Sequence, residues 1–275
     1  MSLKQITLKG AAFIACTMLA TNAWAASCIN SKGQFDAYKQ QLAQQAGSSG
    51  VGQRGLQALQ QAPLSGITWR FESKPSSQSS MRYRSPEQFL KSRFSSVNSF
   101  VSGAKKRLQQ NAGLFQSIES RYGVPGSILV AIWGYETNWG GFTGDTPIVS
   151  GAVTLASYCR RHPRFEDDAI AALQLVDSGL ISGKSRGGPS GELGHMQFLA
   201  GNWVRFAQDG NGDGRKDPNN AADALATAAN MLKRNGWRKG GSFKDGSANF
   251  RVLSAWNDSG NYQRAIAYAA GLIEG

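Results

Sequence analysis

The 275-residue sequence lacks two patterns that would assign it to common protein classes. Its longest apolar run, residues 10–20, is shorter than the roughly 20 residues that a membrane-spanning helix needs. It also lacks the alternation of apolar and polar residues that is typical of half-buried strands. The sequence therefore predicts a mainly α-helical protein with little or no sheet and no transmembrane helix.

The short apolar run belongs to a targeting segment. Lys4 and Lys9 give it a basic start, and the small-x-small sequence Ala23-Trp24-Ala25 follows it. This is the pattern of a secretory signal peptide and its cleavage site. We expect residues 1–25 to be removed and the mature protein to be exported.

Cysteine is scarce, with three residues in the chain. Cys16 lies in the signal peptide, so Cys28 and Cys159 remain in an oxidising compartment, where an even pair favours one disulfide. Lipidation of Cys28, just after the cleavage site, is the alternative. Because Ala25-Ala26-Ser27 lacks the large apolar residue of a lipoprotein signal, we favour the disulfide.

Acidic residues are few, with 18 Asp and Glu against 30 Lys and Arg. Removal of the two lysines of the signal peptide lowers the formal net charge from +12 to +10. Such a charge suits an anionic polymer. Nucleic acid is a poor partner for an exported protein, whereas an acidic cell-wall polymer fits both charge and compartment. A basic surface that only aids solubility is the alternative.

The chain is organised around residues 123–141, which read as a short amphipathic helix. Pro125 suits its first turn, and Gly140 and Gly141 are expected to end it. At about 100° per residue, Glu136 falls within the apolar arc, so its carboxyl group is aimed at the interior. Such a group has a raised pKa or a partner, as in acid–base catalysis. A buried structural salt bridge is the alternative.

Three further stretches carry polar side chains suited to a substrate. Gln197 lies where we expect a helix to open after a glycine-rich loop. Arg160 and Arg161 belong to a basic cluster whose guanidinium groups suit carboxylates. Asn257 and Tyr262 stand in a polar turn of a kind that often lines sugar grooves. The ordinary alternatives are a solvated glutamine, an exposed charged face and a turn beside a core tryptophan.

Asp209, Asn211, Asp213 and Asp217 place oxygen donors at positions 1, 3, 5 and 9 of a calcium-loop spacing, with glycine at position 6. The twelfth position is Asn220 instead of the bidentate glutamate of such loops. Calcium would therefore bind weakly or not at all. A loop kept tight by Asp and Gly turns is the alternative.

Taken in order, these stretches resemble the lytic murein transglycosylase B family, from about residue 35 to about residue 272. The most specific piece is the Glu-Thr-x-Trp-Gly sequence that begins at Glu136. The resemblance implies a lysozyme-like helical fold and cleavage of peptidoglycan between N-acetylmuramic acid and N-acetylglucosamine. It further implies a periplasmic monomer that requires no cofactor. We expect an N-terminal helical region, residues 26–110, to pack on a catalytic domain at residues 111–275.

By position, Glu136 matches the family's catalytic glutamate. Gln197, Asn257 and Tyr262 match residues that line the glycan groove, and Arg160 and Arg161 match arginines placed towards the muropeptide. The family's calcium loop corresponds to Asp209, Asn211, Asp213 and Asp217. Two departures concern substrate-length preference. Gly188 stands where many members have a serine, and only a short connection joins Trp237 to Trp256 where longer members insert a β-rich segment.

Hydrolysis would need a second carboxylate facing Glu136. Asp145, Asp167 and Glu192 are candidates by proximity, but none lies in a comparable apolar frame. A single glutamate instead suits a substrate-assisted route that ends in a 1,6-anhydro product. A hydrolytic muramidase and a non-catalytic peptidoglycan-binding or assembly protein are the alternatives.

Overall fold

The structure, a computed structural model, describes residues 26–74 and 83–275. The signal peptide predicted at residues 1–25 lies outside the described residues. The α-helices, in chain order, are α1 (Phe35–Ser48), α2 (Gln53–Gln61), α3 (Gly66–Ser73), α4 (Pro86–Lys91), α5 (Val97–Gln110), α6 (Ala112–Tyr122), α7 (Gly126–Thr137), α8 (Ile148–Ser157), α9 (Glu166–Asp177), α10 (Ala200–Phe206), α11 (Ala221–Arg234), α12 (Ala248–Val252) and α13 (Gly260–Glu274).

Short elements complete the fold. The 3-10 helices are η1 (Lys32–Gln34), η4 (Gly194–Met196) and η5 (Leu253–Ala255). Strands β1 (Thr146–Pro147) and β2 (Arg186–Gly187) form one small antiparallel pair. The prediction of a mainly helical protein with little sheet is confirmed. In the part of the chain that the structure describes, no helix combines the length and apolar character needed to cross a membrane.

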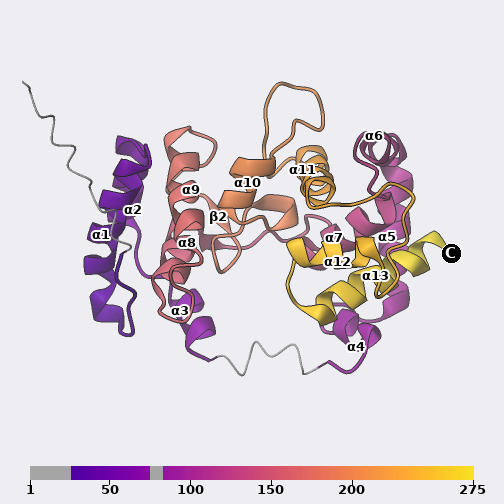
Figure 1. The fold of residues 1–275 in the computed structure, drawn as a ribbon, viewed down its shortest axis with the longest axis horizontal. Helices are drawn as coiled ribbons and strands as arrows, with labels where there is room; N and C mark the ends of the chain where they lie inside the picture. Colours follow the sequence, from indigo (N-terminus) through magenta and orange to yellow (C-terminus); the bar gives the residue numbers. More distant parts are fainter. Residues whose placement is uncertain (1–25, 75–82) are drawn as a thin grey trace, which may run out of the picture.

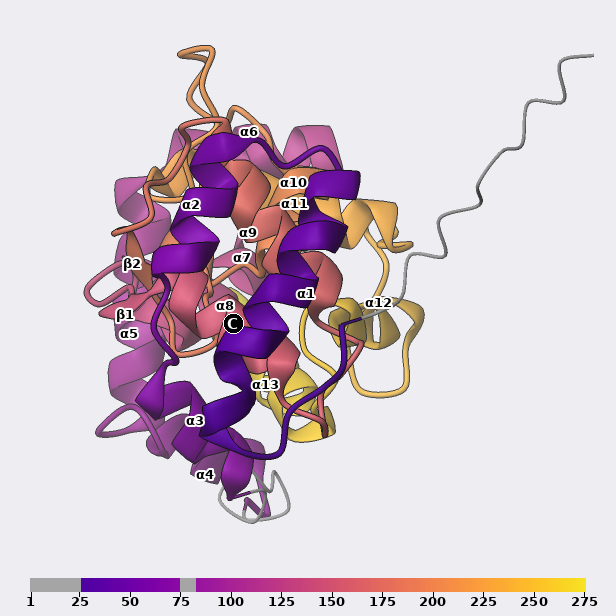
Figure 2. The same ribbon diagram turned by 90° about the vertical axis from the view of Figure 1, so that its left-hand side faces the viewer.

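The helices form two groups with α10 and α11 between them (Figure 1). In one group α1, α2 and α3 pack on α8 and α9, and Figure 2 shows α1 and α2 as its outer face. In the other group α5 packs against α7 and α13, and α4 packs against α5 and α13. Helices α1 to α5, which belong to the predicted N-terminal region, therefore occur in both groups. The predicted boundary between that region and a catalytic domain at residue 110 stays a prediction.

Helix α7 lies at the centre of the second group and is buried on all sides. Helices α5, α6, α11 and α13 all contact it. Every residue of α7 is buried except Glu136, which keeps partial exposure. The prediction of an amphipathic helix is therefore wrong, because neighbours cover the face that was expected to meet solvent.

The end of α7 also differs from the prediction. The helix ends at Thr137, before the two glycines, and the next two residues, Asn138 and Trp139, adopt left-handed φ angles of 51° and 55°. The Trp139 indole folds back along the helix, where its Nε1 donates to the Val130 carbonyl oxygen at 3.0 Å. Its ring also stacks on Phe100. Packing of Trp139 thus turns the chain before a glycine is reached.

Two other local predictions need correction. The helix expected to open at Gln197 does not begin there, because Gln197 has a left-handed φ of 50° and lies between η4 and α10. Helices α3 and α12, of eight and five residues, were not predicted. Both are too short to show a clear apolar period, although each begins with a serine cap, Ser65 and Ser247.

The predicted disulfide is present. Cys28 and Cys159 are bonded across a sequence separation of 131 residues, with their Cα atoms 4.7 Å apart. Next to the disulfide, the Ile29 N–H donates to the Ser157 carbonyl oxygen at 2.8 Å. The first described residues are therefore held on the C-terminal end of α8 by a covalent bond and by backbone pairing.

Candidate active site

Glu136 lies in the last turn of α7 and lines a cleft of about 820 Å³. Its Oε1 accepts a hydrogen bond from the Tyr262 hydroxyl at 2.7 Å and another from the Trp256 indole Nε1 at 3.2 Å. Both donors lie more than a hundred residues further along the chain. They fix the orientation of the carboxyl group at the cleft wall.

Burial raises the pKa of Glu136 above its ordinary value, and the nearby Glu192 charge adds to that shift. The hydrogen bonds from Tyr262 and Trp256 and the charge of Arg93 act in the opposite direction. Desolvation outweighs them, so the protonated acid is favoured more than in a solvated glutamate. This is the state that a proton donor needs.

The Glu-Thr-x-Trp-Gly sequence docks the end of α7 onto η4. The Thr137 hydroxyl donates to the His195 carbonyl oxygen at 2.7 Å and accepts from the Gly140 N–H at 2.9 Å. Gly140 has a φ of 82°, and a Cβ there would lie less than 3.0 Å from the His195 ring. Trp133 Nε1 donates to His195 Nδ1 at 3.1 Å. These contacts bring the residues that follow η4 to the cleft.

Gln197 and Asn257, predicted to line a groove, both line this cleft. Gln197 Nε2 donates to the carbonyl oxygens of Thr143 and Gly194 at 2.9 and 3.0 Å, which fixes its amide group. Asn257 Oδ1 accepts from the Ser259 N–H at 3.0 Å, close to the start of α13. The two amides therefore come from distant segments and share one cleft with Glu136.

Tyr262 is placed behind Glu136. Its side chain is 2 % exposed, and its ring meets the Tyr135 ring edge-on at a centroid distance of 5.4 Å. Burial, followed by the charge of Glu136, raises the pKa of Tyr262 well above its ordinary value, so its hydroxyl keeps its proton. The geometry thus makes Tyr262 a donor to Glu136, and the residue does not belong to the cleft lining.

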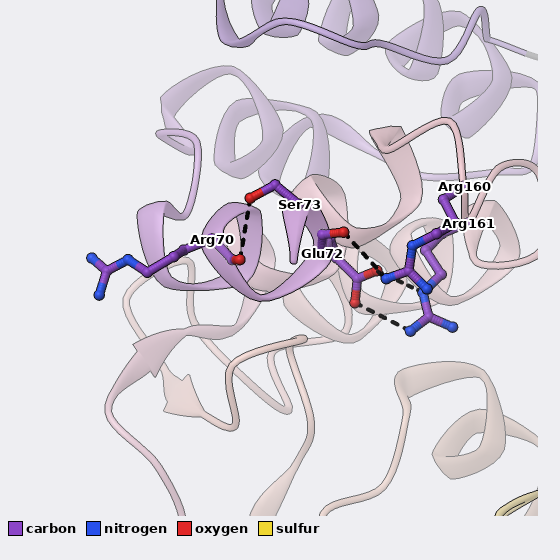
Figure 3. Close-up of polar contacts among 5 residues, drawn as sticks. All are labelled: Arg70, Glu72, Ser73, Arg160 and Arg161. Atoms are coloured by element: carbon purple, nitrogen blue, oxygen red, sulfur yellow. Dashed lines mark hydrogen bonds and ion pairs between the residues drawn. The ribbon is translucent and has the colours of Figure 1, made fainter. Parts of the chain in front are cut away.

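Arg160 and Arg161 share one carboxyl group, that of Glu72 on α3 (Figure 3). Arg161 Nε lies 2.7 Å from Oε2 and its Nη2 lies 3.3 Å from Oε1, while Arg160 Nη2 contacts Oε2. Glu72 is 2 % exposed. In the same view Arg70 points away from the cluster. Arg161 and Glu72 line the cleft, whereas Arg160 does not.

Arg93, between α4 and α5, was not identified from the sequence. Its Nη1 donates to the carbonyl oxygens of Tyr135 and Glu136 at 2.7 and 3.3 Å. These oxygens belong to the last turn of α7, where backbone acceptors lack helical partners. Arg93 also lines the cleft. A lone arginine in a weakly patterned segment gave no signal for this role.

Glu192 also places its carboxyl group at the cleft, as Glu136 and Glu72 do. Its Oε2 accepts from the Ser190 N–H at 2.7 Å, and burial raises its pKa above the ordinary value. The prediction that no other candidate shares the setting of Glu136 is therefore wrong for Glu192. The Gly188 N–H donates to the Glu192 carbonyl oxygen, and this hydrogen bond closes a turn that directs the Glu192 side chain towards the cleft. Asp145 and Asp167 do not line the cleft.

The predicted calcium loop is hydrogen-bonded within itself. Its carboxylates accept backbone N–H groups of the loop, and Asn220 caps α11 through Ala222 N–H at 2.9 Å. Buried Asp223 closes the loop by accepting from the N–H groups of Gly210 and Asp217. Within residues 26–74 and 83–275, no group of three or more His, Cys, Asp and Glu side chains could hold a metal ion.

As arranged, the donors at Asp209, Asn211, Asp213 and Asp217 thus do not form a calcium cage. Asn211 and Asp213 instead bond each other, with Nδ2 of the first 2.9 Å from Oδ2 of the second. That contact also lowers the pKa of Asp213. Calcium binding at this loop stays a prediction from the sequence.

Comparison with known proteins agrees with this fold. Residues 34–245 match the family model described as the transglycosylase SLT domain. Membrane-bound lytic murein transglycosylase B of Escherichia coli (strain K12) is 35% identical over 121 residues, which cover 43% of this chain and 34% of that protein. The alignment thus spans about one third of the length of that relative.

Two solved structures show the same fold. Escherichia coli lytic transglycosylase SLT35, in complex with calcium, superimposes with a TM-score of 0.71 at 20% identity and covers 86% of this chain and 92% of that one. SltB3 from Pseudomonas aeruginosa, in complex with NAG-NAM-pentapeptide, has a TM-score of 0.73 at 22% identity, covering 88% and 80%. The family match spans most of the chain, so this protein belongs to the transglycosylase SLT domain family, as its resemblance to lytic murein transglycosylase B predicts.

Proposed function

We propose that the protein is a lytic transglycosylase that cleaves the β-1,4 bond between N-acetylmuramic acid and N-acetylglucosamine in peptidoglycan and leaves 1,6-anhydromuramic ends. The observation that carries the proposal is the carboxyl group of Glu136, buried enough to favour its proton yet facing a cleft. The name of the E. coli relative and the NAG-NAM-pentapeptide bound to SltB3 support this substrate class.

Glu136 acts first as an acid and then as a base. Its O–H proton passes to the glycosidic oxygen as the bond to the anomeric carbon breaks, and the muramoyl acetamido oxygen bonds that carbon. The Glu136 carboxylate then takes the proton of the sugar's 6-hydroxyl. The 6-oxygen attacks the anomeric carbon and displaces the acetamido oxygen. Water enters no bond, and Glu136 regains its proton.

The cleft supplies contacts suited to a glycan strand. Gln197 and Asn257 offer amide groups, and Phe142, which is 67 % exposed, offers a ring face at the cleft wall. Flat apolar faces beside hydrogen-bonding groups match the two kinds of surface on a sugar ring. These residues support the assignment of the cleft to a polysaccharide.

The basic residues fit the peptide-bearing part of the substrate. Arg161 and Arg164 line the same cleft as Glu136, and the mature chain carries a net charge of +10 after loss of the predicted signal. Stem-peptide carboxylates would be attracted there, although Arg160 and Arg161 already bind Glu72. We further propose that the protein acts in the periplasm, as a monomer and without a required cofactor.

Digestion of purified peptidoglycan in oxygen-18 water tests the reaction. We expect soluble muropeptides with unlabelled anhydro ends from the wild-type protein and none from the Glu136→Gln variant. Glu119→Gln, a change at an exposed glutamate of α6, is the matched control and retains activity. Labelled reducing ends would identify a hydrolytic muramidase. Binding without products would identify a peptidoglycan-binding protein.

A further inference from the structure

The space beside Gly188 is filled by two side-chain oxygens. A Cβ placed on Gly188 would lie less than 3.0 Å from Oε2 of Glu192 and from Oε1 of Gln197. The φ of Gly188 is ordinary, so a side chain at this position would meet these two oxygens without backbone strain. A carboxyl oxygen and an amide oxygen therefore lie side by side next to Gly188.

Both oxygens are fixed, and both belong to residues that line the cleft. The Gln197 amide nitrogen donates to two backbone carbonyl oxygens, so its orientation directs Oε1 towards Gly188. Glu192 is held by the Ser190 N–H at 2.7 Å. Two adjacent acceptors form a site for one N–H or O–H donor of a ligand.

The acetamido group of the muramoyl residue supplies the N–H whose donor strength changes most during the reaction. Its nitrogen becomes positively charged when its oxygen bonds the anomeric carbon. A carboxylate that accepts this N–H therefore binds the transition state more strongly than the substrate. An amide oxygen alone gives a weaker bond, because hydrogen bonds to charged groups are the stronger ones.

We propose that Glu192 binds the acetamido N–H of the N-acetylmuramoyl residue, beside Gln197 Oε1, and stabilises the positive charge that forms as the acetamido oxygen attacks. This role rests on the proposed function. In that step the bond between the acetamido oxygen and the anomeric carbon forms, the glycosidic bond breaks, and the proton of Glu136 leaves with the glycosidic oxygen. The N–H proton stays on nitrogen, hydrogen-bonded to the Glu192 carboxylate.

Binding measured without turnover tests the contact directly. In the Glu136→Gln background, isothermal titration with a tetrasaccharide of alternating N-acetylglucosamine and N-acetylmuramic acid gives a dissociation constant. Adding Glu192→Ala is expected to raise it about tenfold or more, the loss of a hydrogen bond to a charged group. Asp145→Ala, at an exposed carboxylate outside the cleft, is the matched control and leaves it unchanged.

Equal affinity with and without the Glu192 carboxyl group, or no binding in the Glu136→Gln background, overturns the proposal. The assay does not depend on catalysis. A wild-type protein that releases no anhydro products, combined with an affinity that depends on Glu192, would reject the proposed function and leave the contact standing. The two proposals therefore fail separately.

The space at Gly188 provides a second test. Gly188→Ser alone is expected to weaken tetrasaccharide binding, because its Cβ meets the Glu192 carboxyl group. Combined with Glu192→Ala, the serine side chain no longer meets the carboxyl group and approaches only Gln197 Oε1, so the double variant should lose less affinity than the sum of the two single losses. If the affinity losses of the two single variants simply add in the double variant, the side chains at positions 188 and 192 do not compete for one space. Labelled reducing ends that disappear in Glu192→Gln would instead make Glu192 a base for water and overturn the acetamido assignment.

Discussion

The hydroxyl of Tyr262 donates a 2.7 Å hydrogen bond to Oε1 of Glu136, which joins the start of α13 to the end of α7. This bond lowers the pKa of Glu136, against the larger effect of burial. Tyr262→Phe should raise that pKa, so the alkaline limb of kcat/KM moves to higher pH. We expect kcat to fall roughly tenfold, the scale of one hydrogen bond. A shift to lower pH would contradict this.

Tyr268→Phe is the control for that experiment. Tyr268 lies on the same helix, and its hydroxyl contacts Glu87, which is not a residue of the cleft. Its pH profile should match that of the wild-type protein.

Replacement of Glu136 should also change stability. The folded protein binds the Glu136 proton more tightly than the unfolded chain, so the free energy of unfolding falls as pH rises from the unfolded pKa through the folded pKa. Glu136→Gln removes this dependence, while its amide oxygen still accepts from Tyr262 and Trp256. The variant should have a higher free energy of unfolding than the wild type at pH 7, and this difference should disappear below about pH 4. Denaturant titrations across pH measure it.

Loss of the Glu72 carboxylate should destabilise the contact between α3 and the segment after α8. Glu72→Gln leaves Arg160 and Arg161 without their shared counter-charge, which we expect to cost about 1–3 kcal/mol. Guanidinium titration is the measurement. Asp36→Asn, which breaks the ion pair between the exposed Asp36 carboxylate and Lys39, is the matched control, with a cost of about 0–1 kcal/mol. An equal loss of unfolding free energy in the two variants would show that the burial of Glu72 does not strengthen its ion pairs.

The disulfide should stabilise the fold strongly, because it closes a loop of 131 residues. The double change Cys28→Ser with Cys159→Ser should lower the free energy of unfolding by about 5 kcal/mol in the chain-entropy model. Thermal unfolding with and without a reducing agent measures this. The reductant should lower the midpoint of the wild-type protein and leave that of the serine variant unchanged.

Phe142 should affect binding without affecting stability. It is 67 % exposed and lines the cleft, so Phe142→Ala removes a ring face while costing little packing. Affinity for the tetrasaccharide should fall several-fold, on the scale of about 1 kcal/mol for a stacking contact. Val204→Ala, at another exposed apolar residue outside the cleft, should leave affinity unchanged. A parallel drop in melting temperature would argue for a structural role.

The sequence was sufficient to predict the helical fold and the Cys28–Cys159 pair. Each depends on information local to the chain: the apolar period and an even cysteine count. The angular position of Glu136 carried less information, because α7 is buried on all sides. The contact of Glu72 with Arg160 and Arg161 could not be predicted, because the arginines lie 88 and 89 residues further along the chain. Arg93 gave no signal for the same reason, since its partners are carbonyl oxygens of another helix.

The end of α7 and the place of Glu192 show a second limit. A glycine pair is a sound local stop signal, yet the packing of Trp139 ended the helix earlier. Glu192 was a candidate by proximity alone, because its burial depends on the turn at Gly188 and on the surrounding cleft. In both cases tertiary contacts decided what the local pattern left open.

The two side chains that hold Glu136 enter the chain late, at Trp256 and Tyr262. In a chain whose α13 has not docked on α7, the Glu136 carboxyl group therefore lacks both donors and part of the burial that raises its pKa. The setting of this carboxyl group is complete only when the last helix of the chain is in place.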